Sequence, residues 1–171
     1  MYLLLIVGVA VSAGCEKKTN PVDYNNTIIN EQAKVVDIVL DFNAKIDIDS
    51  FKQARVLLDK TGIQCDSSIK AVEALGDYEG DASFKNAAID LFKFYKRASV
   101  QDYKELLDLI EKEEMTDEDY DRVTLILQNL KNEEEVLDDK VRTAQKAFAD
   151  KHGVKITGNP IQDKIDNIEK E

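Results

Sequence analysis

The fold class is decided by residues 116–153, TDEDYDRVTLILQNLKNEEEVLDDKVRTAQKAFADKHG. Thr116 is the expected helix N-cap, acidic residues follow it on the positive end of the helix dipole, and Gly153 suits the position after a helix C-terminus. Between them runs a heptad seam with alternating spacings of three and four, formed by Val123, Leu127, Leu130, Glu134, Leu137, Val141, Ala144 and Phe148. This pattern predicts one long helix that packs against others along the seam.

Helix-breaking residues are scarce in the rest of the chain. The two prolines, Pro21 and Pro160, lie outside residues 22–159, a run of 138 residues without proline, and the whole chain has 7 glycines. Proline and glycine interrupt helices, and the strict alternation of apolar and polar residues that marks strands is absent from this sequence. The composition therefore predicts long helices and an all-α fold.

Three helices are expected before residue 116, over about 21–44, 50–75 and 82–110. Asn20 is the expected N-cap of the first, with Pro21 at its first helical position. Ser50 and Gln53 have the spacing of a capping box at the start of the second. The second helix also has a heptad seam, which places Cys65 in the core.

The third helix is expected to be continuous, because its apolar row persists across Ser99, although Ser99 and Asp102 have capping-box spacing that favours a break. Short connections make consecutive helices antiparallel neighbours. The sequence therefore predicts an antiparallel up-down-up-down four-helix bundle over residues 21–152. The alternative is a three-helix bundle with a loosely attached N-terminal helix. Residues 153–171 form a tail, with a short helix expected after Pro160.

Charge and histidine content exclude several kinds of function. With 23 basic and 34 acidic residues the net charge is −11, and no basic stripe interrupts the acidic background, so we expect no nucleic-acid binding. One histidine, His152, excludes a His-containing di-iron centre, a zincin site and a His-based catalytic triad. An EF-hand loop starting at Asp77 has Ala82 where glycine is required. We therefore expect no enzyme activity, metal or cofactor.

One seam position is polar where its neighbours are apolar. Glu134 lies on the seam of the last helix, and folding the chain about its hairpins places Tyr95 near it, Thr61 and Gly62 near Tyr95, and Gln32 near those. A buried carboxylate is costly without hydrogen-bond partners, and Tyr95 is able to donate to it. Two roles are open for such a polar layer: it fixes the register of the bundle, or it forms a small polar pocket opened by Gly62.

The amino terminus begins with an uncharged run. Residues 2–13 carry no charge over twelve positions, too few to span a bilayer, which takes about 20, but suitable for the apolar region of a secretory signal. The sequence Ser12-Ala13-Gly14-Cys15 that ends it resembles the lipobox of bacterial lipoproteins, in which the cysteine is diacylated and becomes the first mature residue. Ser12 departs from the preferred leucine, and Met1-Tyr2-Leu3 lacks the usual basic residue. An ordinary cleaved signal and a buried terminal segment are the alternatives.

This resemblance, to small all-helical bacterial lipoproteins, implies a division of the chain and a location. Residues 1–14 become a signal peptide and 15–20 a lipid anchor with a short tether. The protein is then held in the bacterial cell envelope, on the periplasmic or extracellular side, by acylated Cys15 in the membrane. The expected role is a non-enzymatic interaction or structural module with an envelope protein as partner. The alternative is a binding protein for a small ligand at the polar layer.

The tether also predicts an orientation. Five residues between Cys15 and the first helix span at most about 18 Å, so the bundle is held close to the lipid. The start of the first helix, the 76–81 turn and His152 then lie near the membrane. The opposite end would carry the contact with a partner, through a distal tip formed by Asp47, Asp49, Met115 and Asp117.

Overall fold

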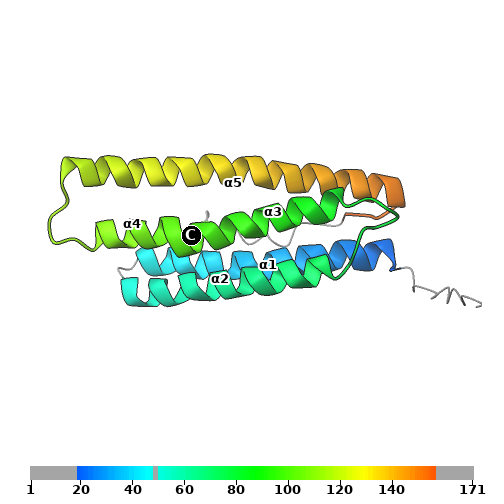
Figure 1. Cartoon of the computed structure of the whole chain (residues 1–171), viewed down its shortest axis with the longest axis horizontal. Helices are drawn as coiled ribbons and strands as arrows, with labels where there is room; N and C mark the ends of the chain where they lie inside the picture. Colours follow the sequence, from blue (N-terminus) through cyan, green and yellow to red (C-terminus); the bar gives the residue numbers. More distant parts are fainter. Residues whose placement is uncertain (1–18, 48–49, 157–171) are drawn as a thin grey trace, which may run out of the picture.

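A computed structural model describes residues 19–47 and 50–156, without the side chain of Asp47. The described residues form four helical rods. The rods lie side by side in alternating directions (Figure 1). They are α1 (Pro21–Asp47), α2 (Phe51–Glu73), a composite rod of α3 (Ser83–Arg97), the π-helical segment η1 (Ala98–Asp102) and α4 (Tyr103–Ile110), and α5 (Asp117–His152). The described residues form no β-strand. The all-α, up-down-up-down four-helix bundle is confirmed.

Several helix ends are set by the predicted local signals. The N–H of Val22 donates to Asn20 Oδ1 at 2.8 Å, so Asn20 caps α1. Thr116 and Asp119 form a reciprocal capping box, with N···O distances of 3.2 and 3.0 Å. Gly153 follows α5 in the left-handed conformation, with φ of 66°. These three predictions are confirmed because caps depend on the residues of a single turn.

Two local predictions are wrong. Ser50 makes no side-chain capping bond, since its backbone turns at φ −92° and ψ 51°, and Gln53 donates instead through its N–H to the Ser50 carbonyl at 2.9 Å. The first helix continues past Ala44 to Asp47. Ile46, in that extra turn, packs against the buried cluster around Phe42, and this contact favours continuing the helix.

The third helix follows one continuous path, as expected, but its middle is a π-helical segment. The N–H of Tyr103 donates to the carbonyl of Ala98, five residues earlier, in place of the usual four. Ser99 does not cap a new helix, because its hydroxyl donates to the Tyr95 carbonyl at 2.6 Å. No side chain caps the start of α4, where Asp102 is the preceding residue. The break suggested by the capping-box spacing therefore does not occur.

The three-helix alternative is wrong, because α1 is an integral part of the bundle. It packs along α2 and also contacts α3 and α5. Its buried face includes Tyr24, Ile28, Val35 and Phe42, each no more than 1% exposed. Fully burying each such side chain stabilises the fold by roughly 1.5–3 kcal/mol. A helix with this face would not stand loosely beside three others.

The seam of α5 is confirmed except at its second position, Leu127. Leu130, Val141 and Phe148 are buried, but Leu127 is 46% exposed. Ile126, at 4% exposure, is the buried residue of that turn instead. A straight α-helix drifts by about 20° per heptad relative to an exact seven-residue repeat. Over a helix of 36 residues this drift turns Leu127 out of the core.

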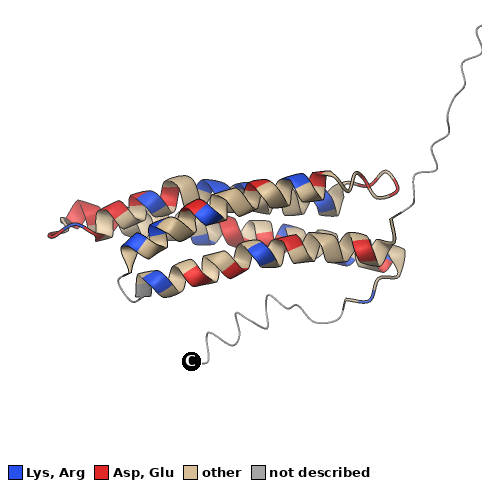
Figure 2. Cartoon of the chain, turned by 90° about the horizontal axis from the view of Figure 1, so that it is seen from below, with Lys and Arg blue, Asp and Glu red and all other residues tan. Residues whose placement is uncertain are grey.

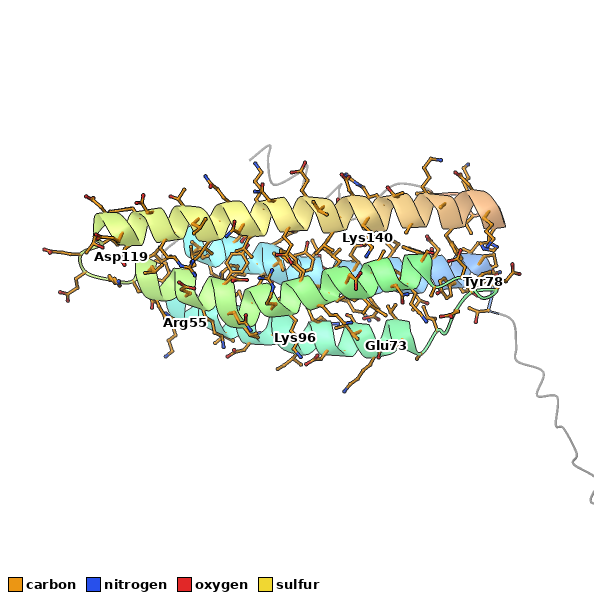
Figure 3. The ribbon with its side chains drawn as sticks, turned by 45° about the horizontal axis from the view of Figure 1, so that its top comes forward. Arg55, Glu73, Tyr78, Lys96, Asp119 and Lys140 are labelled. Atoms are coloured by element: carbon orange, nitrogen blue, oxygen red, sulfur yellow. The ribbon has the colours of Figure 1, made fainter. Side chains whose placement is uncertain are left out.

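Interhelical ion pairs follow the contact between α2 and the composite rod. The pairs are Arg55–Asp108 (2.7 Å), Asp59–Lys104 (2.8 Å) and Asp66–Lys96 (2.6 Å). Residue numbers rise along α2 as they fall along the rod, as expected for antiparallel helices. Figure 3 shows Arg55 and Lys96 along this contact. Exposed pairs contribute about 0–1 kcal/mol each, so they mark the register more than they stabilise it.

The burial of Cys65 predicts slow thiol chemistry. The residue is fully buried, and burial raises the pKa of its thiol to about 12, so little reactive thiolate exists at pH 8. In a Cys15→Ser variant, where Cys65 is the sole thiol, a disulfide reagent should react about 100-fold more slowly with native protein than with guanidinium-unfolded protein. Equal rates in both states would contradict the burial of Cys65. Cys65→Ala should lower the free energy of unfolding by about 1–2 kcal/mol.

Candidate functional site

The centre of the predicted polar layer exists. Tyr95 of α3 donates its hydroxyl to Glu134 Oε1 of α5 at 2.6 Å. Burial, and then the charge of Glu134, raises the pKa of Tyr95 well above its usual value, so its hydroxyl remains a donor. Burial also raises the pKa of Tyr103 to about 12, with Glu134 the next cause. Glu134 therefore lies near the protonated hydroxyl groups of Tyr95 and Tyr103. In the Tyr95–Glu134 pair, each side chain is the hydrogen-bond partner of the other.

The other predicted members do not join this pair. Thr61 is buried, but its hydroxyl donates within its own helix to the Leu57 carbonyl at 2.9 Å. Gln32 is buried on α1, and no hydrogen bond among the described residues connects it to Tyr95 or Glu134. A single polar layer across all four rods is therefore wrong. The reason is that a helical threonine is able to bond the carbonyl four residues earlier and so needs no distant partner.

Gly62 does not open a pocket. It is buried where η1 packs against α2, and a Cβ built on it would lie 3.3 Å from Val100 Cγ1. A valine of the π-helical segment thus fills the space that a side chain at position 62 would take. Gly62 permits the close approach of two rods, which is a packing role.

A second buried polar cluster lies between α1 and α2. Ser68 donates to Glu31 Oε2 at 2.9 Å, Gln64 donates to Ser68 at 3.0 Å, and Lys34 pairs with Glu31 at 2.5 Å. Sequence reasoning selected the neighbouring Gln32 and missed Glu31. Ser68, a polar residue on the seam of α2, was the available signal that a polar partner faces it.

A pocket of about 600 Å³ opens between the composite rod and α5. We call it the η1 pocket. It is lined by Arg97 and Asp102 of the rod and, on α5, by Arg122, Ile126, Asn129, Leu130, Asn132, Glu133, Val136 and Leu137. Its size is within the range of small-ligand sites. Most of its α5 residues, those from 122 to 133, lie in the half of α5 next to the distal tip.

The π-helical segment shapes this pocket. Arg97 and Asp102 are five residues apart, which in an α-helix of 3.6 residues per turn puts them on different faces. Across η1 they meet, with Arg97 Nη1 3.1 Å from Asp102 Oδ2. Arg97 also pairs with Glu133 of α5 at 2.6 Å and lies over the ring of Phe94 at 5.5 Å. No residue pattern in the sequence indicates a π-helical segment, so this site was not predicted.

The opposite end of the η1 pocket is fixed by a bidentate pair. Arg122 donates through Nε and Nη2 to the two oxygens of Glu105, at 2.6 and 2.8 Å. Asn129 and Asn132 are exposed on α5, and neither side chain makes a hydrogen bond within the described part of the chain. The two arginines that line the pocket therefore pair with carboxylates. The side-chain amides of the two asparagines keep their hydrogen-bonding groups for a ligand or water.

His152 closes α5 inside an aromatic cluster. Its ring lies 4.7 Å from the rings of Tyr78 and Phe148, and its side chain is 8% exposed. Nδ1 is 3.8 Å from Glu79. Residues 19–47 and 50–156 contain no cluster of three side chains suited to hold a metal ion. Within the same ranges no helix is long and apolar enough to cross a bilayer.

The predicted distal tip is described in part. The end of α1 and the turn before α5 lie at the same end of the bundle (Figure 1), and Figure 2 shows acidic residues gathered at that turn. Met115 is half-buried and Asp117, the first residue of α5, is exposed. Asp49, the side chain of Asp47, Cys15 and the tail after residue 156 lie outside the described residues.

Comparisons with protein-family models, with curated proteins and with solved structures return no match to this chain.

The Tyr95–Glu134 bond predicts energetic coupling between two helices. Tyr95→Phe and Glu134→Leu should each cost about 1–2 kcal/mol, because each leaves a half-buried polar partner unsatisfied. The double variant should cost less than the two single variants together, by about 1 kcal/mol, since it removes both partners. Urea unfolding followed by circular dichroism measures these values. Tyr120→Phe, at an exposed tyrosine, is the control and should change stability by less than about 0.5 kcal/mol. Additive effects of Tyr95→Phe and Glu134→Leu would contradict the bond.

Proposed function

We propose that this chain is a lipid-anchored cell-envelope protein whose helical bundle is a non-enzymatic interaction or structural module. The observation that carries the proposal is the sequence Ser12-Ala13-Gly14-Cys15 at the end of an uncharged run, followed at once by Glu16. An apolar run closed by small residues is typical of a cleaved secretory signal. Diacylation of Cys15 would hold the protein at a lipid surface.

The arrangement of the bundle supports this function. α1 begins at Pro21, six residues after Cys15, so the anchor would lie beside the end of the bundle where α1 starts. The loop between α2 and α3 and the end of α5 lie at that same end (Figure 1). The distal tip, and the half of α5 that packs beside η1 and α4, would then be directed away from the membrane. An envelope partner would have access to them there.

A small-ligand site at the polar layer has weaker support. Tyr95 and Glu134 satisfy each other, and Val100 fills the space beside Gly62. A ligand there would have to replace a part-buried hydrogen bond and displace a packed side chain, and both are costly. We therefore favour a surface that contacts another protein.

The anchor is tested by Cys15→Ala in the full-length chain, expressed in a bacterium. Wild-type protein should sediment with membranes, and its intact mass should include a diacylglycerol on a mature chain that begins at Cys15. The variant should appear in the soluble fraction, because about 0.8 kcal/mol per buried CH₂ of acyl chain is lost.

Cys65→Ala is the matched control, since it removes the other cysteine and should leave the protein in the membrane fraction. Circular dichroism of both variants checks that the bundle is intact. Tight membrane retention of Cys15→Ala with normal helix content would refute the lipid anchor.

A further inference from the structure

One apolar side of α1 is only partly accounted for by the core of the bundle. Gln145 of α5 donates to Asn25 Oδ1 at 3.0 Å, which marks the side of α1 that faces α5. Ile29 and Val36 follow Asn25 on that side after about one and three turns, and Ala33 between them completes what we call the α1 row. Ile29 and Ala33 are half-buried, and Val36 belongs to neither buried apolar cluster of the described residues. The two clusters therefore do not account for all the apolar surface on this side of α1.

The chain leaves α5 toward this same side of α1. Gly153 turns in the left-handed conformation, and the N–H of Val154 then donates to the Ala149 carbonyl at 2.9 Å. Val154 is 8% exposed and belongs to the larger buried cluster. Ala149 lies one turn after Gln145, and so on the side of α5 that faces α1. Val154 therefore holds the chain in the seam between α1 and α5, at the end of the bundle where α1 begins.

The sequence that follows has the same apolar spacing as the α1 row. Residues 157–171 lie outside the described part of the chain. The short helix expected after Pro160 has one apolar face, formed by Ile161, Ile165 and Ile168. These isoleucines are four and then three residues apart, as are the members of the α1 row. Two parallel helices with equal spacing bring their apolar side chains level at every step, because both rise by the same distance per residue.

The lengths along the bundle also agree. Ile29 is eight residues into α1, about 12 Å from its start. The five residues from Ile156 to Ile161 span at most about 17 Å, which is enough to bring Ile161 level with Ile29. From there Val36 and Ile168 are each seven residues further on, a rise of about 10.5 Å in both helices. A helix of about eleven residues is marginal alone, so it needs an apolar surface of this kind to form.

We propose that the C-terminal segment 160–168 docks as a further helix on the α1 row, parallel to α1 in the seam between α1 and α5. Its isoleucines cover the row in register, Ile161 on Ile29, Ile165 on Ala33 and Ile168 on Val36. The occupant is this segment of the same chain, because the few residues after Val154 hold it beside the row at an effective concentration in the millimolar range, on the order of that given by a short linker. The inference goes beyond the lipid anchor and does not depend on it.

Disulfide trapping tests the register. Ala33→Cys and Ile165→Cys are combined in the full-length Cys15→Ser chain, solubilised in detergent, in which the buried Cys65 reacts slowly. Mild oxidation should link the two new cysteines in most molecules, because level positions of packed helices lie within reach of a disulfide. Ile63→Cys with Ile165→Cys is the matched control. Ile63 is 71% exposed on α2, outside the seam, and this pair should link at least about tenfold less.

Mass spectrometry of the linked peptides, from a mixture of ¹⁵N-labelled and unlabelled chains, shows whether each bond lies within one chain. A bond within one chain supports the proposal. Bonds between chains would mean that a second copy covers the α1 row, and a yield no higher than that of the control pair would mean that the segment does not reach it; either result overturns the proposal.

Amide hydrogen exchange gives a second measurement that needs no new thiol. In the wild-type chain the amides of residues 164–168 should exchange at least about tenfold more slowly than in an unstructured peptide of the same sequence. Ala33→Asp places a charge in the α1 row and should remove this protection. Asn30→Asp, at an exposed position of the same helix outside the row, should leave it unchanged. Circular dichroism checks that both variants keep the bundle, and unprotected amides over 164–168 in the wild-type chain would overturn the proposal whatever the variants do.

Discussion

The bundle depends most on an aromatic cluster that joins its first and last helices. Tyr24 of α1 stacks on Phe148 of α5 with ring centroids 5.2 Å apart, and Tyr78, from the loop between α2 and α3, meets both rings edge-on at 5.1 Å. Burial raises the pKa of Tyr24 to about 12, so its hydroxyl remains protonated and donates to the Gly76 carbonyl at 3.2 Å. The Tyr24–Phe148 contact connects segments 124 residues apart, and each aromatic pair adds about 0.5–1.5 kcal/mol beyond its buried area. They close the ring of rods at the end where α1 begins.

The interior away from this cluster combines apolar packing with a few satisfied polar groups. The Tyr95–Glu134 and Ser68–Glu31 bonds each link two different helices. Replacing such a pair by apolar residues is often neutral in stability, whereas breaking it is costly. Their effect is to penalise any shift in register, because a shifted helix would leave the buried Glu31 or the half-buried Glu134 without its donor. The sequence specifies one alignment of its helices partly through these polar contacts.

The sequence predicted features that depend on a single turn or on a regular repeat. Thr116 and Gly153 were identified from one turn each, and Tyr95 was placed against Glu134 by counting along two antiparallel seams. Glu31 was missed because α1 contacts three other helices and buries both Glu31 and Gln32, and periodicity does not define so wide a face residue by residue. η1 was missed because an added residue in a helical turn depends on packing, here of Val100 against Gly62, and not on the residues of the turn. The η1 pocket follows from that same distortion, so it was beyond sequence reasoning.

The charge pattern of α5 bears on how an anchored bundle would be oriented. Residues 117–139 contain nine acidic and two basic side chains, whereas 140–152 contain one acidic and four basic ones, not counting His152. The acidic loop near the basic end is largely compensated, since Asp77 pairs with Lys85 and Asp81 with Lys151. An anionic lipid surface attracts basic side chains by about 1 kcal/mol each and repels acidic ones. For a chain anchored at Cys15, electrostatics and the short tether thus favour the same orientation, in which the basic end of α5 faces the lipid and the η1 pocket faces away from it.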